Sequence, residues 1–271
     1  MAPHIAFLGA GNMAGAIISG LLADGFAPEQ LSASDPSDAA LAKLRALGLT
    51  QLYASPEPLC ENADLVVLAV KPQVAPAALT ALAPYLKPDT ALLSIAAGIS
   101  TTSLQKYAGN AVPIIRCMPN TPAMIGKGAS ALFASERASE GARQLAERIT
   151  NAVGITVWVR EERQLDAVTA VSGSGPAYFF AMIEAIAKAG TDLGLDADVA
   201  MALTLQTAWG AASLAQQADV DVSTLRTNVT SPGGTTEQAL LSLAEGGFDA
   251  VIAEAVERCA ARSRTLGEEF G

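Results

Sequence analysis

The first 160 residues alternate between short, mostly apolar runs and longer segments with helical spacing, and this alternation limits the possible folds more than any other feature. Strands covered by helices on both faces read as near-continuous apolar runs, and strands that alternate with helices form parallel sheets. The pattern predicts a doubly wound α/β fold with a mostly parallel sheet. The expected strands are residues 4–9, 31–35, 65–70, 91–96, 112–117, 129–134 and 155–159. Segments with helical spacing lie between them, such as residues 13–23, 39–47, 75–86 and 136–153.

After Arg160 the strand-length runs stop, and long alanine-rich segments with 3.6-residue spacing follow. A chain of 271 residues also exceeds what one hydrophobic core usually fills. We therefore expect an α/β domain over residues 1–160 and an all-α domain over residues 161–271. Residues 176–193 are apolar on nearly every face, which suits a helix buried by its own domain or by a partner subunit. Further helices are expected at residues 197–217, 222–228, 235–245 and 249–266.

The charge balance excludes two classes of partner. The chain has 17 Lys and Arg against 27 Asp and Glu, a formal net charge of −10, so we expect no binding to nucleic acid or to an anionic membrane surface. No apolar run approaches the roughly 20 residues that span a bilayer. The first strand follows the N-terminus without a basic leader, so we expect no signal peptide and a cytoplasmic location.

Histidine and cysteine are scarce, which restricts the chemistry. His4 is the one histidine, so a site built from several histidines within one chain is excluded. The three cysteines, Cys60, Cys117 and Cys259, lie far apart with no C-x-x-C spacing. We expect no disulfide framework and no metal, which suits a reducing cytoplasm, and we expect a cofactor to supply the chemistry.

A glycine-rich turn follows the first expected strand and opens the first expected helix. Residues 9–14 read Gly-Ala-Gly-Asn-Met-Ala, a G-x-G-x-x-A spacing. Gly9 permits a tight turn, Gly11 lets the backbone approach a pyrophosphate at the helix N-terminus, and Ala14 lets helix and strand pack closely. An ordinary glycine-rich turn is the alternative. The strand before and the helix after favour dinucleotide binding, as in a Rossmann-type domain.

Ser34 and Asp35 end the second expected strand, where a dinucleotide domain contacts the adenosine ribose. An acidic residue here usually bonds the ribose hydroxyls and favours NAD. The hydroxyls of Ser34 and Ser37 weakly favour NADP. A turn in which Asp35 or Ser37 caps the next helix is an equally good interpretation.

Later strand ends supply further candidates, because ligands of a parallel sheet sit beyond the carboxyl ends of its strands. These segments are Ala69-Val70-Lys71-Pro72-Gln73, Ala96-Ala97-Gly98 and Met118-Pro119-Asn120-Thr121-Pro122. Each one alone is also an ordinary strand-ending turn. Because these segments and the glycine-rich turn all follow the carboxyl ends of strands, together they favour one binding site.

Two segments of the helical half stand before helices. Residues 172–178 read Ser-Gly-Ser-Gly-Pro-Ala-Tyr, with Pro176 suited to a first helical turn. Residues 230–236 read Thr-Ser-Pro-Gly-Gly-Thr-Thr. The backbone N–H groups at such a helix start can hold a carboxylate, and Thr236 adds a hydroxyl. A simple helix start or capping turn is the alternative for each segment.

The order and spacing of five motifs resemble the pyrroline-5-carboxylate reductase family. They are AVKPQ (69–73), SIAAGIS (94–100), RCMPNTP (116–122), SGSGPAY (172–178) and NVTSPGGTT (228–236). The resemblance covers essentially the whole chain. It implies a reductase that transfers a hydride from NADP(H), with NAD(H) possible, to the imine of 1-pyrroline-5-carboxylate and gives L-proline. It also implies a homodimer or a higher homo-oligomer such as a decamer, dimerised through the helical domain.

The resemblance assigns roles to matching positions. Thr236 is implied to bond the ring nitrogen and to be the catalytic residue, and Asp219 stands where many members have a glutamate of the partner subunit. The implied substrate-binding residues are Asp219, Ser231, Gly233, Gly234, Thr235 and Thr236. The implied cofactor-binding residues are Leu8, Gly9, Ala10, Gly11, Asn12, Met13, Ser34, Asp35, Ala69, Val70, Lys71, Pro72, Ala96, Ala97, Gly98 and Asn228.

The chemistry of the residues agrees with this family. A protonated ring nitrogen makes the imine carbon electrophilic, so positioning and a proton relay through Thr236 or water suffice, and no histidine is needed. A β-hydroxyacid dehydrogenase has the same domain order but uses a lysine in this region, where residues 176–193 carry only Lys188. A nucleotide-sensing protein without catalysis is the alternative from another class.

Overall fold

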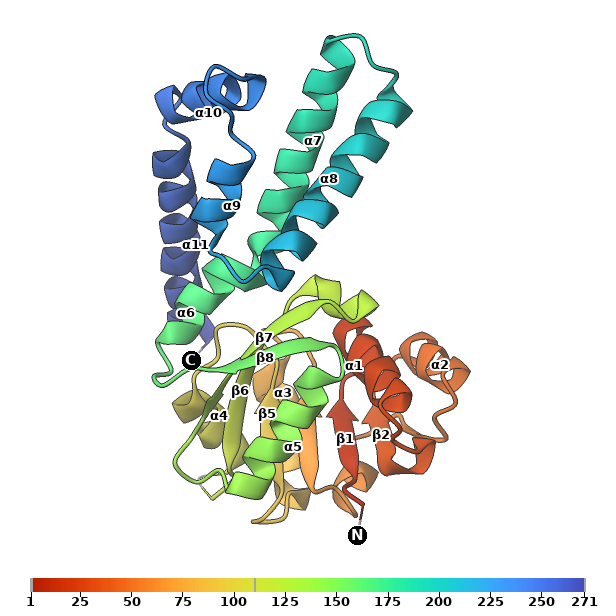
Figure 1. Cartoon of the computed structure of the whole chain (residues 1–271). Helices are drawn as coiled ribbons and strands as arrows, with labels where there is room; N and C mark the ends of the chain where they lie inside the picture. Colours follow the sequence, from red (N-terminus) through yellow and green to blue (C-terminus); the bar gives the residue numbers. More distant parts are fainter. Residues whose placement is uncertain (1, 110, 271) are drawn as a thin grey trace. The chain divides into compact units, whose positions relative to one another are not determined.

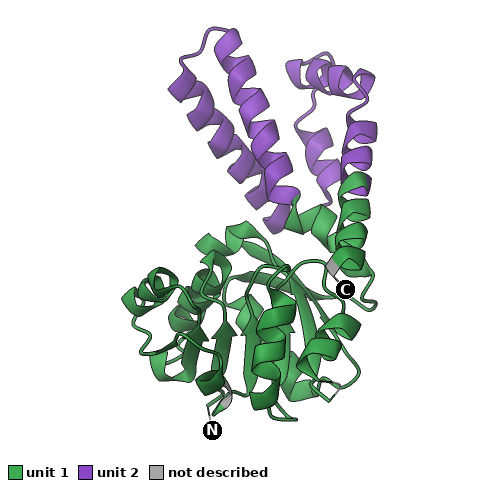
Figure 2. Cartoon of the chain, turned by 180° about the vertical axis from the view of Figure 1, so that it is seen from behind, with its two compact units in different colours: residues 1–174, 258–271 green, residues 175–257 purple. Residues whose placement is uncertain are grey.

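The computed structural model describes residues 2–109 and 111–270, which form two compact units (Figure 2). Unit 1 comprises residues 1–174 together with 258–271, and unit 2 comprises residues 175–257. The helical region is thus an insertion in the chain of unit 1, which resumes for the last turns of the final helix. The boundary that the sequence predicts at residue 160, between a dinucleotide-binding domain and a helical substrate and dimerisation domain, stays a prediction.

Unit 1 is built on one eight-stranded sheet in the order β3-β2-β1-β4-β5-β6-β7-β8 (Figure 1). All neighbours pair in parallel except β6 and β7, which are antiparallel. The predicted doubly wound, mostly parallel sheet is confirmed. The strands are β1 (Ile5–Leu8), β2 (Leu31–Ser34), β3 (Gln51–Tyr53), β4 (Leu65–Leu68), β5 (Ala91–Ser94), β6 (Ile114–Met118), β7 (Gly128–Ala134) and β8 (Gly154–Trp158).

Helices cover both faces of this sheet, and alternate residues of each strand pack against opposite layers. The helices are α1 (Asn12–Ala23), α2 (Asp38–Ala46), α3 (Ala75–Leu82), α4 (Thr101–Ala108), α5 (Glu140–Asn151) and α6 (Gln164–Val168), followed by a π-helical turn (Thr169–Gly173). In β1, Ile5 and Phe7 join the core beneath α1, α2 and α5, whereas Ala6 and Leu8 join the core beneath α3 and α4. Short 3₁₀ turns are η1 (Pro28–Gln30), η2 (Glu57–Cys60), η3 (Ala83–Tyr85) and η4 (Thr121–Ile125).

Local capping explains where three of these helices begin. The hydroxyls of Ser37, Ser100 and Ser139 accept hydrogen bonds from the backbone N–H groups three residues on, at the starts of α2, α4 and α5. Such serine caps satisfy donors that have no partner within the helix.

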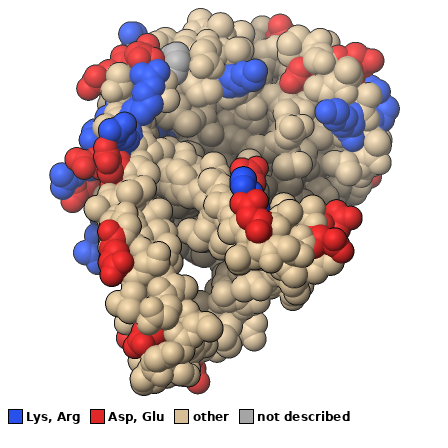
Figure 3. Space-filling view, turned by 90° about the horizontal axis from the view of Figure 1, so that it is seen from above, with Lys and Arg blue, Asp and Glu red and all other residues tan. Residues whose placement is uncertain are grey.

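Unit 2 is entirely helical where the structure describes it, as predicted. Its elements are α7 (Gly175–Asp192), α8 (Ala197–Gln217), α9 (Val222–Asn228), α10 (Thr235–Glu245) and the first part of α11 (Phe248–Phe270). Many of its large apolar side chains are exposed in the single chain, among them Phe179, Phe180 and Trp209, whose exposed fractions are 64%, 59% and 66%. Figure 3 shows broad areas of surface without charged side chains.

Within the described residues, no helix combines the length and the apolar character needed to cross a bilayer.

Candidate functional site

The glycine-rich turn between β1 and α1 has the shape that a dinucleotide phosphate requires. Gly9 has a φ of +106°, and a Cβ there would lie 2.7 Å from the Ala69 carbonyl oxygen, so only glycine fits. Gly11 is the N-cap of α1 and no side chain caps the helix. The N-terminal amides of α1 are therefore available to an anion. The turn fits the phosphates of a dinucleotide, and their binding stays a prediction.

Strand register aligns the other candidate loops with this turn. Leu8 pairs with Ser34 on one side and with Leu68 on the other, and Leu68 pairs with Ser94. The predicted cofactor loops after β1, β2, β4 and β5 therefore lie together at the carboxyl ends of these strands. They are residues 8–13, 34–35, 69–72 and 96–98.

The carboxylate of Asp35 is fixed by two backbone groups. Its Oδ2 accepts a hydrogen bond from the Ala10 N–H at 2.9 Å, and its Oδ1 accepts one from the Ser37 N–H at 2.8 Å. Ser37 caps α2, and Ser34 is 3% exposed. The helix cap by Ser37, which the sequence analysis gave as one alternative, is therefore present. Through its two hydrogen bonds, Asp35 connects the glycine-rich turn to the loop after β2. The ribose contact stays a prediction.

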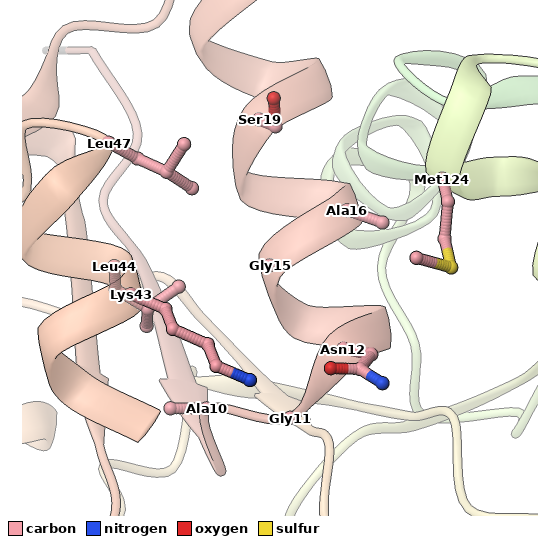
Figure 4. Close-up of a pocket in the computed structure, with 10 residues that line it drawn as sticks. All are labelled: Ala10, Gly11, Asn12, Gly15, Ala16, Ser19, Lys43, Leu44, Leu47 and Met124. Carbon is pink, nitrogen blue, oxygen red and sulfur yellow. The ribbon is translucent and has the colours of Figure 1, made fainter. Parts of the chain in front are cut away.

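A groove of about 290 Å³ begins at the glycine-rich turn and runs between α1 and α2 (Figure 4). Its walls include one charged side chain, that of Lys43 on α2, and a side chain from η4, Met124. Sequence reasoning missed both residues, because a lysine or a methionine on a helical turn gives no local signal of a distant cavity. The lining residues are Ala10, Gly11, Asn12, Gly15, Ala16, Ser19, Lys43, Leu44, Leu47 and Met124.

The loop after β6 is held by a nearly buried asparagine. Asn120 accepts a hydrogen bond from the Ala129 N–H at 2.8 Å, and its Nδ2 donates to the Ser172 carbonyl oxygen at 3.1 Å. A Cβ on Gly173 would come within 2.3 Å of the Met118 methyl carbon. Two motifs that lie far apart in the sequence, residues 116–122 and residues 172–174, are therefore in contact within unit 1.

A second glycine contact joins the last turns of α11 to the loop after β5. Gly98 has a φ of +79°, and a Cβ on Gly267 would come within 2.9 Å of the Gly98 carbonyl oxygen. The Ser263 hydroxyl donates to an Asp166 carboxylate oxygen at 2.7 Å, which fixes the same end of α11 to α6. The loop that contains Ala96, Ala97 and Gly98 thus packs against the end of the chain.

In unit 2, the turn before α10 presents backbone amides at a helix start. Gly233 has a φ of +71°, and Gly234 is the N-cap of α10 without a side-chain cap. The Gly233 N–H donates to the Glu237 carboxylate at 2.7 Å. Thr235 and Thr236 are the first residues of α10, and Asn228 ends α9. Asp219 lies between α8 and α9.

The buried titratable groups of unit 1 have structural partners. His4 shares a 3.0 Å hydrogen bond with the Ser32 hydroxyl, and burial lowers the pKa of its imidazole below the usual 6.5, against the raising effect of Asp64. Burial raises the pKa of the Cys117 thiol to about 12, so this thiol is not a nucleophile. Among the residues that the structure describes, no three His, Cys, Asp or Glu side chains gather to hold a metal ion.

An ionic cluster holds the start of α4, just after the Ala96–Gly98 loop. The Glu162 carboxylate accepts hydrogen bonds from the Thr101 N–H at 2.6 Å, the Thr101 hydroxyl at 2.7 Å and the Arg116 guanidinium at 2.7 Å. Burial by itself would raise the pKa of Glu162, but these three donors together hold it below its usual value. Sequence reasoning missed the cluster, because its members are at least 46 residues from Glu162.

Comparison with known proteins covers both units. A family model described as pyrroline-5-carboxylate reductase dimerisation matches residues 162–266, and one described as NADP oxidoreductase, coenzyme F420-dependent, matches residues 4–98. A pyrroline-5-carboxylate reductase of Pseudomonas aeruginosa is 47% identical over 99% of this chain and 98% of that protein.

Solved structures agree with this comparison. The structure of a pyrroline-5-carboxylate reductase from Coxiella burnetii matches with a TM-score of 0.93 and 38% identity, over 98% of this chain and 99% of that one. The crystal structure of a Plasmodium falciparum pyrroline carboxylate reductase with NADP bound matches with a TM-score of 0.86 and 30% identity, over 98% of each chain.

Proposed function

The chain belongs to the pyrroline-5-carboxylate reductase family, and on that premise we propose that it reduces the C=N bond of 1-pyrroline-5-carboxylate with NAD(P)H to give L-proline. This reaction is the final step of proline biosynthesis. The relationship over the whole chain is the observation that carries the proposal, and it removes the two alternatives, a β-hydroxyacid dehydrogenase and a nucleotide sensor.

The cofactor is NADPH, with NADH as the alternative, and when bound it supplies the hydride. The turn of residues 9–13 and the N-terminus of α1 hold the pyrophosphate. The donors are the N–H groups of residues 11–13, because those of Gly9 and Ala10 donate to Ser34 and Asp35. Ser34 and Asp35 adjoin the adenosine ribose. The loops 69–72 and 96–98, together with Asn228, contact the nicotinamide half. The strand register supports this assignment, because it brings these loops together at the carboxyl ends of β1, β4 and β5. The match to the NADP oxidoreductase family model and the relative with NADP bound support it as well. No metal takes part.

The carboxylate of the substrate is held by the turn before α10. Ser231, Gly233, Gly234 and Thr235 provide backbone and hydroxyl donors there. The start of α10 supports this assignment, because its N-cap Gly234 brings no side-chain cap and the first amides of a helix can hold a carboxylate. The Gly233 N–H donates to the Glu237 carboxylate at 2.7 Å and would exchange that carboxylate for the one of the substrate. Asp219 completes the substrate site, as a glutamate of the partner subunit does in many members.

Thr236 delivers the proton that balances the reaction. The imine carbon gains a hydride and the ring nitrogen gains a proton, so a donor must reach that nitrogen. An unactivated threonine hydroxyl is a poor acid, but it can relay a proton from water while it orients the ring.

The active protein is a cytoplasmic homodimer or a higher homo-oligomer such as a decamer. The dimerisation family model over residues 162–266 supports association through the helical region. The exposed apolar side chains of unit 2 support it independently.

Two measurements test the proposal. Assays with 1-pyrroline-5-carboxylate and each cofactor should form L-proline. The absence of product with both NADPH and NADH would refute the reaction.

In Thr236→Ala, kcat should fall at least about tenfold, because the proton relay is lost. The Kd for NADPH should not change, and Thr236→Ser should restore turnover. An unchanged kcat in Thr236→Ala would remove Thr236 from the reaction.

A further inference from the structure

The groove between α1 and α2 contains a lysine that no step above uses. Lys43 lies on α2, and its ammonium group extends along the groove toward Ala10 and Gly11 of the glycine-rich turn (Figure 4). It is the one charged side chain among the residues that line this groove. A lysine carries a positive charge on a flexible stem, so it can follow a phosphate without a fixed geometry.

The place of the adenosine ribose, beside Asp35, is otherwise unfavourable to a further phosphate on that ribose. The Asp35 carboxylate is fixed there, because both of its oxygens accept backbone hydrogen bonds, one of them from Ala10 itself. A dinucleotide domain places the adenosine ribose beside this acidic position. A phosphate on the 2′ oxygen of that ribose would therefore meet a fixed negative charge.

Of the two serines of the same loop, one is buried and the other already forms a helix cap. Ser34 is 3% exposed, and the Ser37 hydroxyl accepts the hydrogen bond that caps α2. The neighbouring cation on α2, Arg45, pairs with Asp38 at 3.8 Å and is not among the residues that line the groove. Lys43 is thus the groove-lining group that can offset the charge of Asp35.

We propose that Lys43 binds the 2′-phosphate of NADPH and is the residue that lets this chain accept NADPH in spite of Asp35. The inference rests on the proposed cofactor site and adds a selectivity-determining residue to it. It predicts that Lys43 contributes to binding of the phosphorylated cofactor and not to binding of NADH.

Calorimetric titration of the full-length protein tests this without turnover. The titrants are NADPH, NADH and the fragments 2′,5′-ADP and 5′-ADP, and the proteins are the wild type, Lys43→Gln and Arg45→Gln. In Lys43→Gln we expect the Kd for NADPH and 2′,5′-ADP to rise about tenfold, the size of one charged hydrogen bond. The Kd for NADH and 5′-ADP should stay within about twofold. Arg45→Gln should resemble the wild type with all four ligands.

Three outcomes would overturn the inference. Equal weakening of NADPH and NADH would place Lys43 at the shared pyrophosphate, and unchanged binding would give it no contact with the cofactor. Equal weakening of NADPH by Arg45→Gln would indicate a general effect of charge. Thermal melting of each variant shows that it is folded. If the wild type selects 2′,5′-ADP through Lys43 but makes no L-proline, the proposed reaction fails and this inference stands.

Discussion

Gly9 combines two requirements that no other residue type meets, a positive φ and a close approach to Ala69. We expect Gly9→Ala to lower the free energy of unfolding by about 2 kcal/mol or more, because strain and a backbone clash add. NADPH binding should be lost with it. Gly48→Ala is the matched control, since Gly48 has a φ of +99° with open space around its Cβ position. Chemical denaturation measures the loss of stability, and calorimetric titration measures NADPH binding. Equal losses of stability in the two variants would show that the positive φ alone causes the loss and that the clash with Ala69 does not contribute.

Prediction at the residue scale worked where the constraint is local. The G-x-G-x-x-A spacing identified Gly9 and Gly11 because a tight turn and a close phosphate limit those positions to glycine. The hydrogen bond from the Ala10 N–H to Asp35 and the two hydrogen bonds of Asn120 could not be predicted from the sequence. Their partners, Ala10 and Ser172, are brought close only by the fold.

At the scale of elements, the Glu162 cluster joins β6, the start of α4 and the segment after β8. Because the folded pKa of Glu162 is lowered, its contribution to stability is fully present above the unfolded value of 4.5 and is lost as pH falls through the folded pKa. We expect Glu162→Gln to lower the free energy of unfolding by about 1–3 kcal/mol at pH 7. The difference from the wild type should shrink as the medium becomes more acidic than pH 4.5.

Denaturant unfolding at a series of pH values measures this difference. The neighbouring Glu161→Gln is the control, because Glu161 is exposed and pairs with Arg163 at the surface, where ion pairs contribute little. A stability difference for Glu162→Gln that is the same at pH 3 and pH 7 would contradict the role assigned to the carboxylate.

The elements predicted from the sequence are those with a long periodic or apolar signal. All seven expected strands are present, and the long helices of unit 2 begin and end close to the predicted residues. The three-residue strand β3 was missed, because it is half-buried and too short for a pattern. The short helix α6 and the π-helical turn after it were missed for the same reason, since their few residues span hardly more than one turn.

At the scale of the whole molecule, unit 2 exposes many large apolar side chains, and such surface favours association. We expect the wild type to sediment as a dimer or larger and Trp209→Glu to dissociate, because a buried unpaired charge opposes association. Light scattering measures the mass. Tyr85→Glu, which changes a 44% exposed aromatic residue of unit 1, is the control and should keep the wild-type mass. Dissociation of both variants, or of neither, would contradict association through this surface.

The sequence predicted two regions but not the path of the chain between them. Local periodicity shows where helices replace strands, near residue 160. It does not show that residues 258–271 return to unit 1, because that return depends on contacts such as Ser263 with Asp166 and Gly267 with Gly98.

That return of the final helix matters for anyone who modifies the ends of the protein. A purification tag fused after the last residue begins within a few positions of Gly267, whose backbone packs against the Gly98 loop. A tag fused to the amino-terminal side precedes β1, whose amino end lies at the opposite end of the parallel strands from the cofactor loops. Tagging the amino terminus is therefore the arrangement that leaves the proposed nicotinamide loop undisturbed.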